Sequence, residues 1–152
     1  TTPEQWNAIR RSLDTLLPVA AETGIVLALE NGHESLDDLR YLSALVAEYR
    51  HANLGLCFDS GHANSYSPLG AVGMVQLLAD QLVTCHLHDN YGTGDDHNPP
   101  GKGNIPWTEL VQALQKCPNL RHAESEAGDW QRPAWEKFQA LWTSPATSGT
   151  AI

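Results

Sequence analysis

The sequence has few basic residues and no long apolar run. Lys and Arg number 9 against 18 Asp and Glu, which gives a formal net charge of -9. A protein that grips a nucleic-acid backbone usually presents clustered Lys and Arg, but here the basic residues are scattered apart from Arg10-Arg11. No apolar stretch approaches the roughly 20 residues of a membrane span, and the first residues lack the segments of a signal peptide. We therefore expect no nucleic-acid partner, no membrane contact and a cytoplasmic protein.

Cysteine is also scarce. The three cysteines, Cys57, Cys85 and Cys117, form no CxxC pair, and the first two lie inside apolar runs. This pattern is typical of small buried hydrophobic residues in a reduced, intracellular protein. It argues against a disulfide framework and against a zinc-thiolate site.

Four short apolar runs recur about every thirty positions, and each ends in a side chain that can bind a metal. The four terminal side chains belong to Glu30, Asp59, His86 and Glu124. Buried parallel strands appear as short, nearly continuous apolar runs, and their carboxyl ends carry the chemistry of α/β proteins. Any one of these residues could be a cap, a turn residue or a core histidine. Four in phase predict one shared metal site.

The order of the expected elements is a helix followed by four strand-helix pairs. Strands are predicted at about 25–30, 54–59, 82–88 and 119–126, and helices at about 2–24, 35–49, 67–80, 107–115 and 133–142. This order fits half of a (β/α)8 barrel, which needs about 250 residues, and equally a small open α/β sheet. We expect one domain over residues 1–142 and a flexible tail over 143–152.

A long loop follows the third predicted strand. In a compact domain, a loop such as that from Asp89 to Pro106 is usually either functional or disordered. Alternation places His86 and His88 on one face of the strand, so that one can bind metal and the other substrate. A solvated loop explains Asp95 and Asp96, but it explains His97 and Lys102 less well. Those two residues are therefore candidate substrate contacts.

The candidate ligands are carboxylates and one imidazole. Oxygen-rich sites with one histidine suit Mn²⁺, Mg²⁺, Co²⁺ or Zn²⁺. A structural zinc site is usually closed and contains thiolates. We expect this site to keep positions open for substrate oxygens.

Four stretches of the sequence resemble the xylose isomerase-like superfamily, which includes sugar phosphate isomerases and epimerases and endonuclease-IV-like barrels. They are Leu-Glu-Asn-Gly (29–32), Phe-Asp-Ser-Gly-His (58–62), His-Leu-His-Asp-Asn (86–90) and Asp-Asp-His-Asn-Pro-Pro-Gly-Lys-Gly-Asn-Ile-Pro-Trp (95–107). The resemblance implies a TIM barrel whose strands five to eight hold a divalent metal. It implies the ligands Glu30, Asp59, His86 and Glu124, with His62 contacting substrate. Glu126, two residues further along the same face, is the alternative fourth ligand.

The function implied by the resemblance is sugar or sugar phosphate isomerisation or epimerisation. Glu30 and Glu124 would act as the acid and base that move a proton through an enediolate. An endonuclease-IV-like phosphodiesterase is the second interpretation, because Asp95, His97 and His62 fit part of its metal cluster. A non-catalytic half-barrel that dimerises is the third.

The resemblance begins at the helix before the fifth barrel strand. Either the sequence is a piece of a longer chain or two chains together rebuild a barrel. Unpaired strand edges recruit other strands, and homo-oligomers favour two-fold closure. We therefore expect a homodimer.

Overall fold

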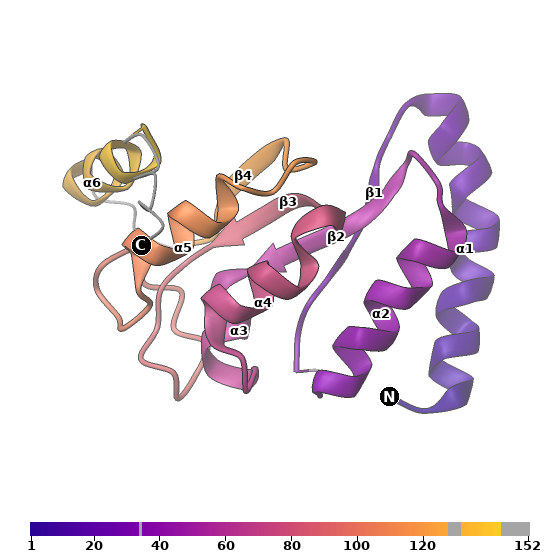
Figure 1. Cartoon of the computed structure of the whole chain (residues 1–152), viewed down its shortest axis with the longest axis horizontal. Helices are drawn as coiled ribbons and strands as arrows, with labels where there is room; N and C mark the ends of the chain where they lie inside the picture. The colour runs from indigo at the N-terminus through magenta and orange to yellow at the C-terminus, as the bar shows by residue number, and fades with distance from the viewer. Residues whose placement is uncertain (34, 128–131, 144–152) are drawn as a thin grey trace, which may run out of the picture.

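The computed structural model describes residues 1–33, 35–127 and 132–143. Its centre is a four-stranded sheet in which every neighbouring pair is parallel, in the order β1-β2-β3-β4 (Figure 1). The strands are β1 (Leu27–Glu30), β2 (Leu54–Asp59), β3 (Leu82–Leu87) and β4 (His122–Ser125). The helices are α1 (Pro3–Thr23), α2 (Leu36–Tyr49), α3 (Ser60–Tyr66), α4 (Gly70–Leu78), α5 (Trp107–Leu114) and α6 (Arg132–Thr143), with a 3-10 turn at Ala79–Gln81.

Local sequence signals explain where the first two helices begin. The Thr2 side chain accepts a hydrogen bond from the backbone N–H of Gln5, and the Gln5 side chain returns one, which forms a capping box. Ser35 and Asp38 form the same motif at the start of α2. Gly24 ends α1 with a φ of 72°, a left-handed conformation that glycine adopts without a steric penalty.

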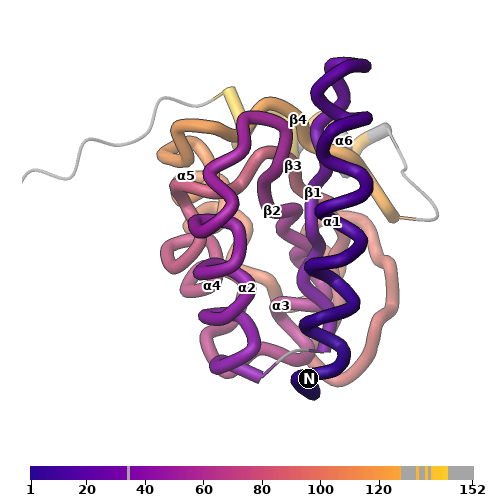
Figure 2. Tube along the Cα trace, turned by 90° about the vertical axis from the view of Figure 1, so that its right-hand side faces the viewer, coloured from indigo at the N-terminus to yellow at the C-terminus, as the bar shows by residue number. Residues whose placement is uncertain are grey.

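The main core lies between the sheet and the helices that follow its strands. Figure 2 shows α2, α4 and α5 on one side of the sheet, with the segment that follows β3 passing on the other side. Every residue of β2 is buried, as expected for a central parallel strand. The largest fully buried side chains include Phe58, Leu39, Leu45, Leu56 and Met74.

The predicted α/β class and the alternation of strands with helices are confirmed, with one omission. The sequence indicated a helix beginning near Ser67, but a separate helix, α3, begins directly after β2. Asp59 is its N-cap, since its Oδ1 accepts a hydrogen bond from the backbone N–H of His62 at 2.7 Å. The predicted tail over 143–152 is outside the described residues except for Thr143, which ends α6.

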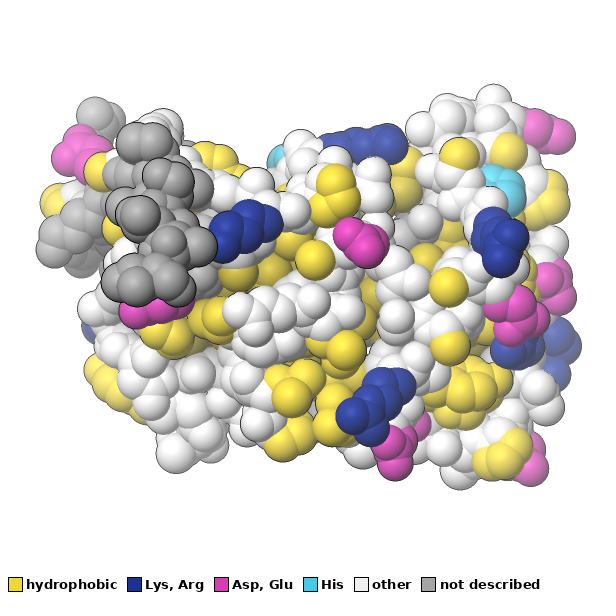
Figure 3. Space-filling view, viewed as in Figure 1, with side chains coloured by type: hydrophobic (Ala, Val, Ile, Leu, Met, Phe, Trp, Pro, Cys, Tyr) yellow, Lys and Arg dark blue, Asp and Glu magenta, His cyan; other side chains and the backbone are white. Residues whose placement is uncertain are grey.

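The surface carries no clustered basic residues on the face shown in Figure 3, where Lys and Arg side chains are dispersed among acidic and apolar ones. Among the described helices, none is long and apolar enough to cross a membrane. Within the described chain, β1 and β4 each pair on one side only. A groove of about 780 Å³ runs beside β4 and α6, and Leu87, Phe138 and Trp142 are among its lining residues.

Candidate metal centre

Polar side chains from three strands and from the residue just after β4 meet at the carboxyl edge of the sheet. Glu30 ends β1, Asp59 ends β2, and His86 is the second-to-last residue of β3. The Nδ1 atom of His86 lies 3.4 Å from Glu30 Oε2 and 3.0 Å from Glu126 Oε1. One imidazole is therefore flanked by carboxylates from two other parts of the sheet.

Asp59 is the most deeply buried acid of this group, with no exposed surface. Its Oδ1 faces the Nε2 of His88 at 3.0 Å in addition to capping α3. Burial raises the pKa of the Asp59 carboxyl, but the hydrogen bonds from His88 and the His62 backbone, together with the charge of both rings, outweigh burial and lower it. Asp59 is therefore held as a carboxylate, and its Oδ2 has no hydrogen-bond partner within the described part of the chain.

Two buried polar residues lock the strand ends in place. The Asn31 side chain accepts a hydrogen bond from the Asp59 backbone N–H at 2.8 Å and donates one to the Asp59 carbonyl at 3.1 Å. The Ser60 hydroxyl donates to the His88 carbonyl at 2.7 Å and accepts from the His88 N–H at 2.9 Å. These contacts join β1 to β2 and β2 to β3 at the level of the cluster.

The loop after β3 is organised around a single buried carboxylate, Asp89. Its two oxygens accept five hydrogen bonds, from the backbone N–H groups of Asn90, Gly101, Gly103 and Ile105 and from the Trp107 indole. An antiparallel bridge between Asp89 and Asn98 closes the base of the loop. The long loop predicted from the sequence is therefore an ordered element that carries Asp95 and His97 to the cluster.

Asp95 faces two histidine rings that are held in similar ways. The Nδ1 of His62 lies 2.9 Å from the Asn31 carbonyl, and the Nδ1 of His97 lies 2.8 Å from the Glu126 carbonyl. The Nε2 atoms of His62 and His97 then lie 3.5 Å and 3.3 Å from Asp95 Oδ2. Burial lowers the pKa of both histidines, but the carbonyls and the nearby carboxylates outweigh burial and raise it.

The carboxylate that reaches His86 from the end of β4 is that of Glu126, whereas the sequence favoured Glu124 as the fourth ligand. The Glu124 side chain is 62% exposed, and its described contact is with His122 at 3.9 Å. Glu124 pairs in register with His86, but the Glu126 N–H bonds to the Leu87 carbonyl at 3.2 Å, beyond the last residue of β4. Glu126 therefore stands closer to the carboxyl edge, where the other ligand candidates gather. The alternation of side chains along a strand places both glutamates on the same face, so only their positions along the chain distinguish them.

The predicted substrate contacts are placed unequally. His62 and His97 have 21% and 39% of their side chains exposed, so both can reach a bound molecule. His88 is fully buried behind Asp59 and stacks on His97 with ring centroids 4.0 Å apart. Its position suits orientation of Asp59 and His97 better than direct contact with substrate. Lys102 is exposed on the same loop.

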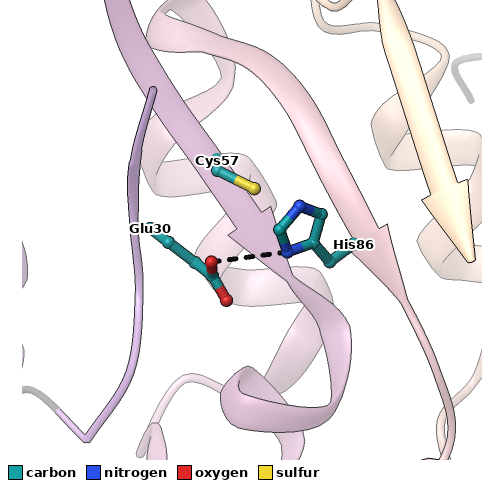
Figure 4. A group of neighbouring side chains, drawn as sticks. All are labelled: Glu30, Cys57 and His86. Atoms are coloured by element: carbon teal, nitrogen blue, oxygen red, sulfur yellow. Dashed lines mark ion pairs between the residues drawn. The ribbon is translucent and has the colours of Figure 1, made fainter. Parts of the chain in front are cut away.

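The sequence interpretation gave no role to Asn31, Cys57 or Asp89. Asn31 and Asp89 lie directly next to the motif residues Glu30 and His88, so a search for polar residues within apolar surroundings could have found them. Cys57 is free and buried, as predicted. Its side chain nevertheless lies beside Glu30 and His86 at the site (Figure 4).

The donor set fits a divalent cation. Among the residues that the structure describes, three buried side-chain polar atoms have no hydrogen-bond partner, and they are Asp59 Oδ2, His86 Nδ1 and His88 Nδ1. Carboxylate oxygens of the described chain approach His86 Nδ1, but none of them is placed to form a hydrogen bond with it. Unsatisfied buried polar groups are costly. Ligand atoms of Asp59, His86 and Glu126 all lie within 4.8 Å of one another, so one cation could satisfy two of the orphaned atoms.

A parallel α/β sheet with a carboxylate-histidine cluster at its carboxyl edge is typical of barrel enzymes. The chain belongs to the xylose isomerase-like TIM barrel family, whose model matches residues 1–135. The family expected from the sequence motifs is thereby confirmed.

Three similar proteins illustrate the relationship. The chain is 32% identical over 127 residues to protein MJ1311 of Methanocaldococcus jannaschii. The matched region covers 75% of this chain and 43% of that protein. A D-tagatose 3-epimerase-like protein matches with a TM-score of 0.69 at 25% identity, covering 87% of this chain and 53% of that one. The TTHB071 protein of Thermus thermophilus, soaked with ZnCl2, matches with a TM-score of 0.70 at 27% identity. The match covers 93% of this chain and 56% of that one. The chain thus spans about half the length of these proteins.

Proposed function

We propose that the chain carries the metal-binding part of a sugar or sugar phosphate isomerase or epimerase. The observation that carries this proposal is the convergence of Glu30, Asp59, His86 and Glu126, with two unsatisfied buried ligand atoms among them. Family membership and similarity to a D-tagatose 3-epimerase-like protein support the reaction class. A divalent cation held there would polarise a substrate carbonyl and acidify the adjacent C–H bond.

The residues of the chain would then divide the proton transfer. Glu30 and Glu126 approach His86 from β1 and from the end of β4, so substrate bound between them would have a carboxylate on each side. One carboxylate removes the proton from the carbon next to the carbonyl, and the other returns it to the neighbouring or opposite position. His62 lies 3.5 Å from Glu30 and can donate a hydrogen bond to a substrate oxygen.

We further propose that the four strands correspond to strands five to eight of an eight-stranded barrel. The two strand edges and the groove beside β4 support this arrangement, because a further β/α unit would pair with β4 and fill the groove beside it. The missing strands would come from further polypeptide or from a second copy. Light scattering tests the second-copy case, since a stable, folded monomer would exclude a homodimer.

Calorimetric titration with Mn²⁺ tests the ligand set. Asp59→Ala removes a buried charged ligand and should weaken binding by at least about 100-fold, since even outer-shell changes cost 10- to 100-fold. Glu126→Gln should weaken binding by at least about tenfold. Glu124→Gln is the matched control and should bind as the wild type does. Loss of affinity in Glu124→Gln but not in Glu126→Gln would make Glu124 the fourth ligand. Unchanged affinity in Asp59→Ala would refute the site.

Proton NMR in D2O tests the reaction. An isomerase or epimerase that moves a carbon-bound proton through a carboxylate should exchange it with solvent, so a panel of ketoses and aldoses should incorporate deuterium next to the carbonyl. Glu126→Gln should abolish the exchange. Exchange that persists in the Glu126→Gln variant would contradict the assigned role.

A second candidate function is metal-dependent phosphodiester hydrolysis. It is favoured by the arrangement of Asp95, His62 and His97. The Nδ1 of each histidine faces a backbone carbonyl, and the Nε2 of each histidine faces the same carboxylate oxygen of Asp95. In a neutral histidine whose Nδ1–H donates to the carbonyl, the Nε2 atom carries a lone pair that would repel the Asp95 oxygen. A second cation between them would bind both Nε2 atoms and the carboxylate oxygen. The net charge of -9 opposes binding to nucleic acid.

Cation stoichiometry and DNA cleavage separate the two functions. Two cations per chain, one lost in His97→Ala, together with cleavage of an abasic-site duplex would favour the hydrolase. One cation per chain, no cleavage and deuterium exchange of a sugar would favour the isomerase.

A further inference from the structure

Cys57 lies on the site side of β2, away from the core that holds the other cysteines. It pairs in register with Glu30 and precedes Asp59 by two positions, so alternation places Cys57 and Asp59 on the same face of the strand. Figure 4 shows its sulfur pointing toward the ring of His86, with the Glu30 carboxylate beneath. Ligand atoms of Glu30, Cys57 and His86 all lie within 4.8 Å of one another.

His86 therefore belongs to two donor sets that differ in chemical character. In one set it is grouped with Asp59 and Glu126, which offer only oxygens. In the other it is grouped with Glu30 and Cys57, and Cys57 adds a sulfur. Oxygen donors suit Mg²⁺ and Mn²⁺, whereas a thiolate selects softer cations. The two sets share His86, so one cation that uses it excludes another.

Cys57 is a buried cysteine that forms no disulfide, and a metal binds a cysteine as the thiolate. A hard cation gains little from sulfur and leaves the thiol intact. A thiophilic cation breaks the S–H bond, forms a metal–sulfur bond and releases the proton to solvent.

The other two cysteines provide an internal contrast. The sulfur of Cys85 lies 3.8 Å from the His122 carbonyl, and that of Cys117 lies 3.5 Å from the Ala113 carbonyl. Neither belongs to a group of potential metal ligands among the described residues. Both are packed into the hydrophobic core.

We infer that Cys57 gives the centre a second binding mode, in which a thiophilic divalent cation is held by Glu30, His86 and the Cys57 sulfur. Mn²⁺ and Mg²⁺ use the oxygen-rich set, and a soft cation that takes the sulfur-containing set displaces them by occupying His86. Cys57 is then a determinant of metal selectivity. This inference rests on the proposed metal-binding function.

Titration of the full chain with Cd²⁺ and, separately, with Mn²⁺ tests the inference. Cd²⁺ should produce a thiolate-to-metal charge-transfer band in the ultraviolet. The band should vanish in Cys57→Ala and Cys57→Ser and persist in Cys85→Ala and Cys117→Ala. Cd²⁺ affinity should fall by at least about tenfold in both Cys57 variants, while Mn²⁺ affinity stays within about threefold of the wild type.

The outcomes separate this inference from the proposed function. Normal Mn²⁺ binding with no charge-transfer band, or a band that survives in Cys57→Ala, would overturn the role of Cys57 and leave the metal site standing. Equal losses of Cd²⁺ and Mn²⁺ affinity would reduce Cys57 to a packing residue. A wild-type chain that binds neither cation would overturn the proposed function itself. Near-normal Mn²⁺ binding by Cys57→Ser would also show that this variant is folded.

Discussion

Asp89→Asn is expected to damage both stability and the candidate metal centre, although it only replaces one carboxylate oxygen by an NH2 group. Asp89 is fully buried. One of its oxygens accepts from two N–H groups and the other from three, at distances of 2.8 to 3.2 Å. Asparagine offers one oxygen and one NH2 group. Whichever way the amide turns, its NH2 group faces at least two N–H donors that it cannot satisfy.

The size of the effect follows from those lost bonds. A hydrogen bond to a charged group contributes about 1.5 to 3 kcal/mol. The loss of at least two gives about 3 to 6 kcal/mol, and single domains are stable by only about 5 to 15 kcal/mol. We therefore expect the variant to be marginally folded, with the loop over residues 90–106 the first part to lose its order.

Urea denaturation and Mn²⁺ calorimetry measure the two consequences. The loop carries Asp95 and His97, and His97 contacts the Glu126 carbonyl at 2.8 Å, so loosening it should lower Mn²⁺ affinity as well as the urea midpoint. Asp96→Asn, an exposed change on the same loop, is the control and should alter neither. A destabilisation below about 1 kcal/mol, or one equal to that of the control, would refute the reasoning.

Two further predictions concern the histidines of the cluster. In Gly61→Ala, the new Cβ would overlap the fully buried His88 ring. This variant should weaken Mn²⁺ binding and lower the melting temperature, whereas Gly94→Ala, where a Cβ meets only ordinary contacts, should do neither; equal behaviour of the two would contradict the packing argument. In EDTA, the raised pKa of His62 predicts a stability contribution that is fully present below its unfolded value of 6.5 and is lost as pH rises through the higher folded value. Melting temperatures across this window should fall in the wild type and fall less steeply in His62→Gln, where the raised pKa of His97 still contributes; an unchanged slope in that variant would assign the effect to another group.

The order of strands and helices was predictable from the sequence because each element carries a local signal. Apolar runs such as the one ending at Asp59 specify buried parallel strands, and Thr2 and Ser35 mark helix starts. Helix α3 was missed because its cap is Asp59 itself, which the sequence presented as a strand end and a ligand.

The convergence of polar side chains at one edge was also predictable, since parallel strands bring their carboxyl ends to that edge. Polar residues at those ends must then meet, whatever the details of the loops. Glu30, Asp59 and His86 converge for this reason. The family resemblance added the expectation that His62 contacts substrate, and the composition of the loop singled out His97; both side chains lie beside the cluster.

The tertiary structure alone decided which groups face each other and at what depth. Glu124 and Glu126 are equivalent by alternation, but only Glu126 reaches His86. Cys57 carries the sequence signature of a core residue, yet it lies against Glu30 and His86. Distances of this kind depend on the stagger between neighbouring strands, where β2 and β3 carry a register shift between Leu56 and Cys57. That stagger comes from packing and hydrogen bonding between segments far apart in the chain, which a local pattern does not encode.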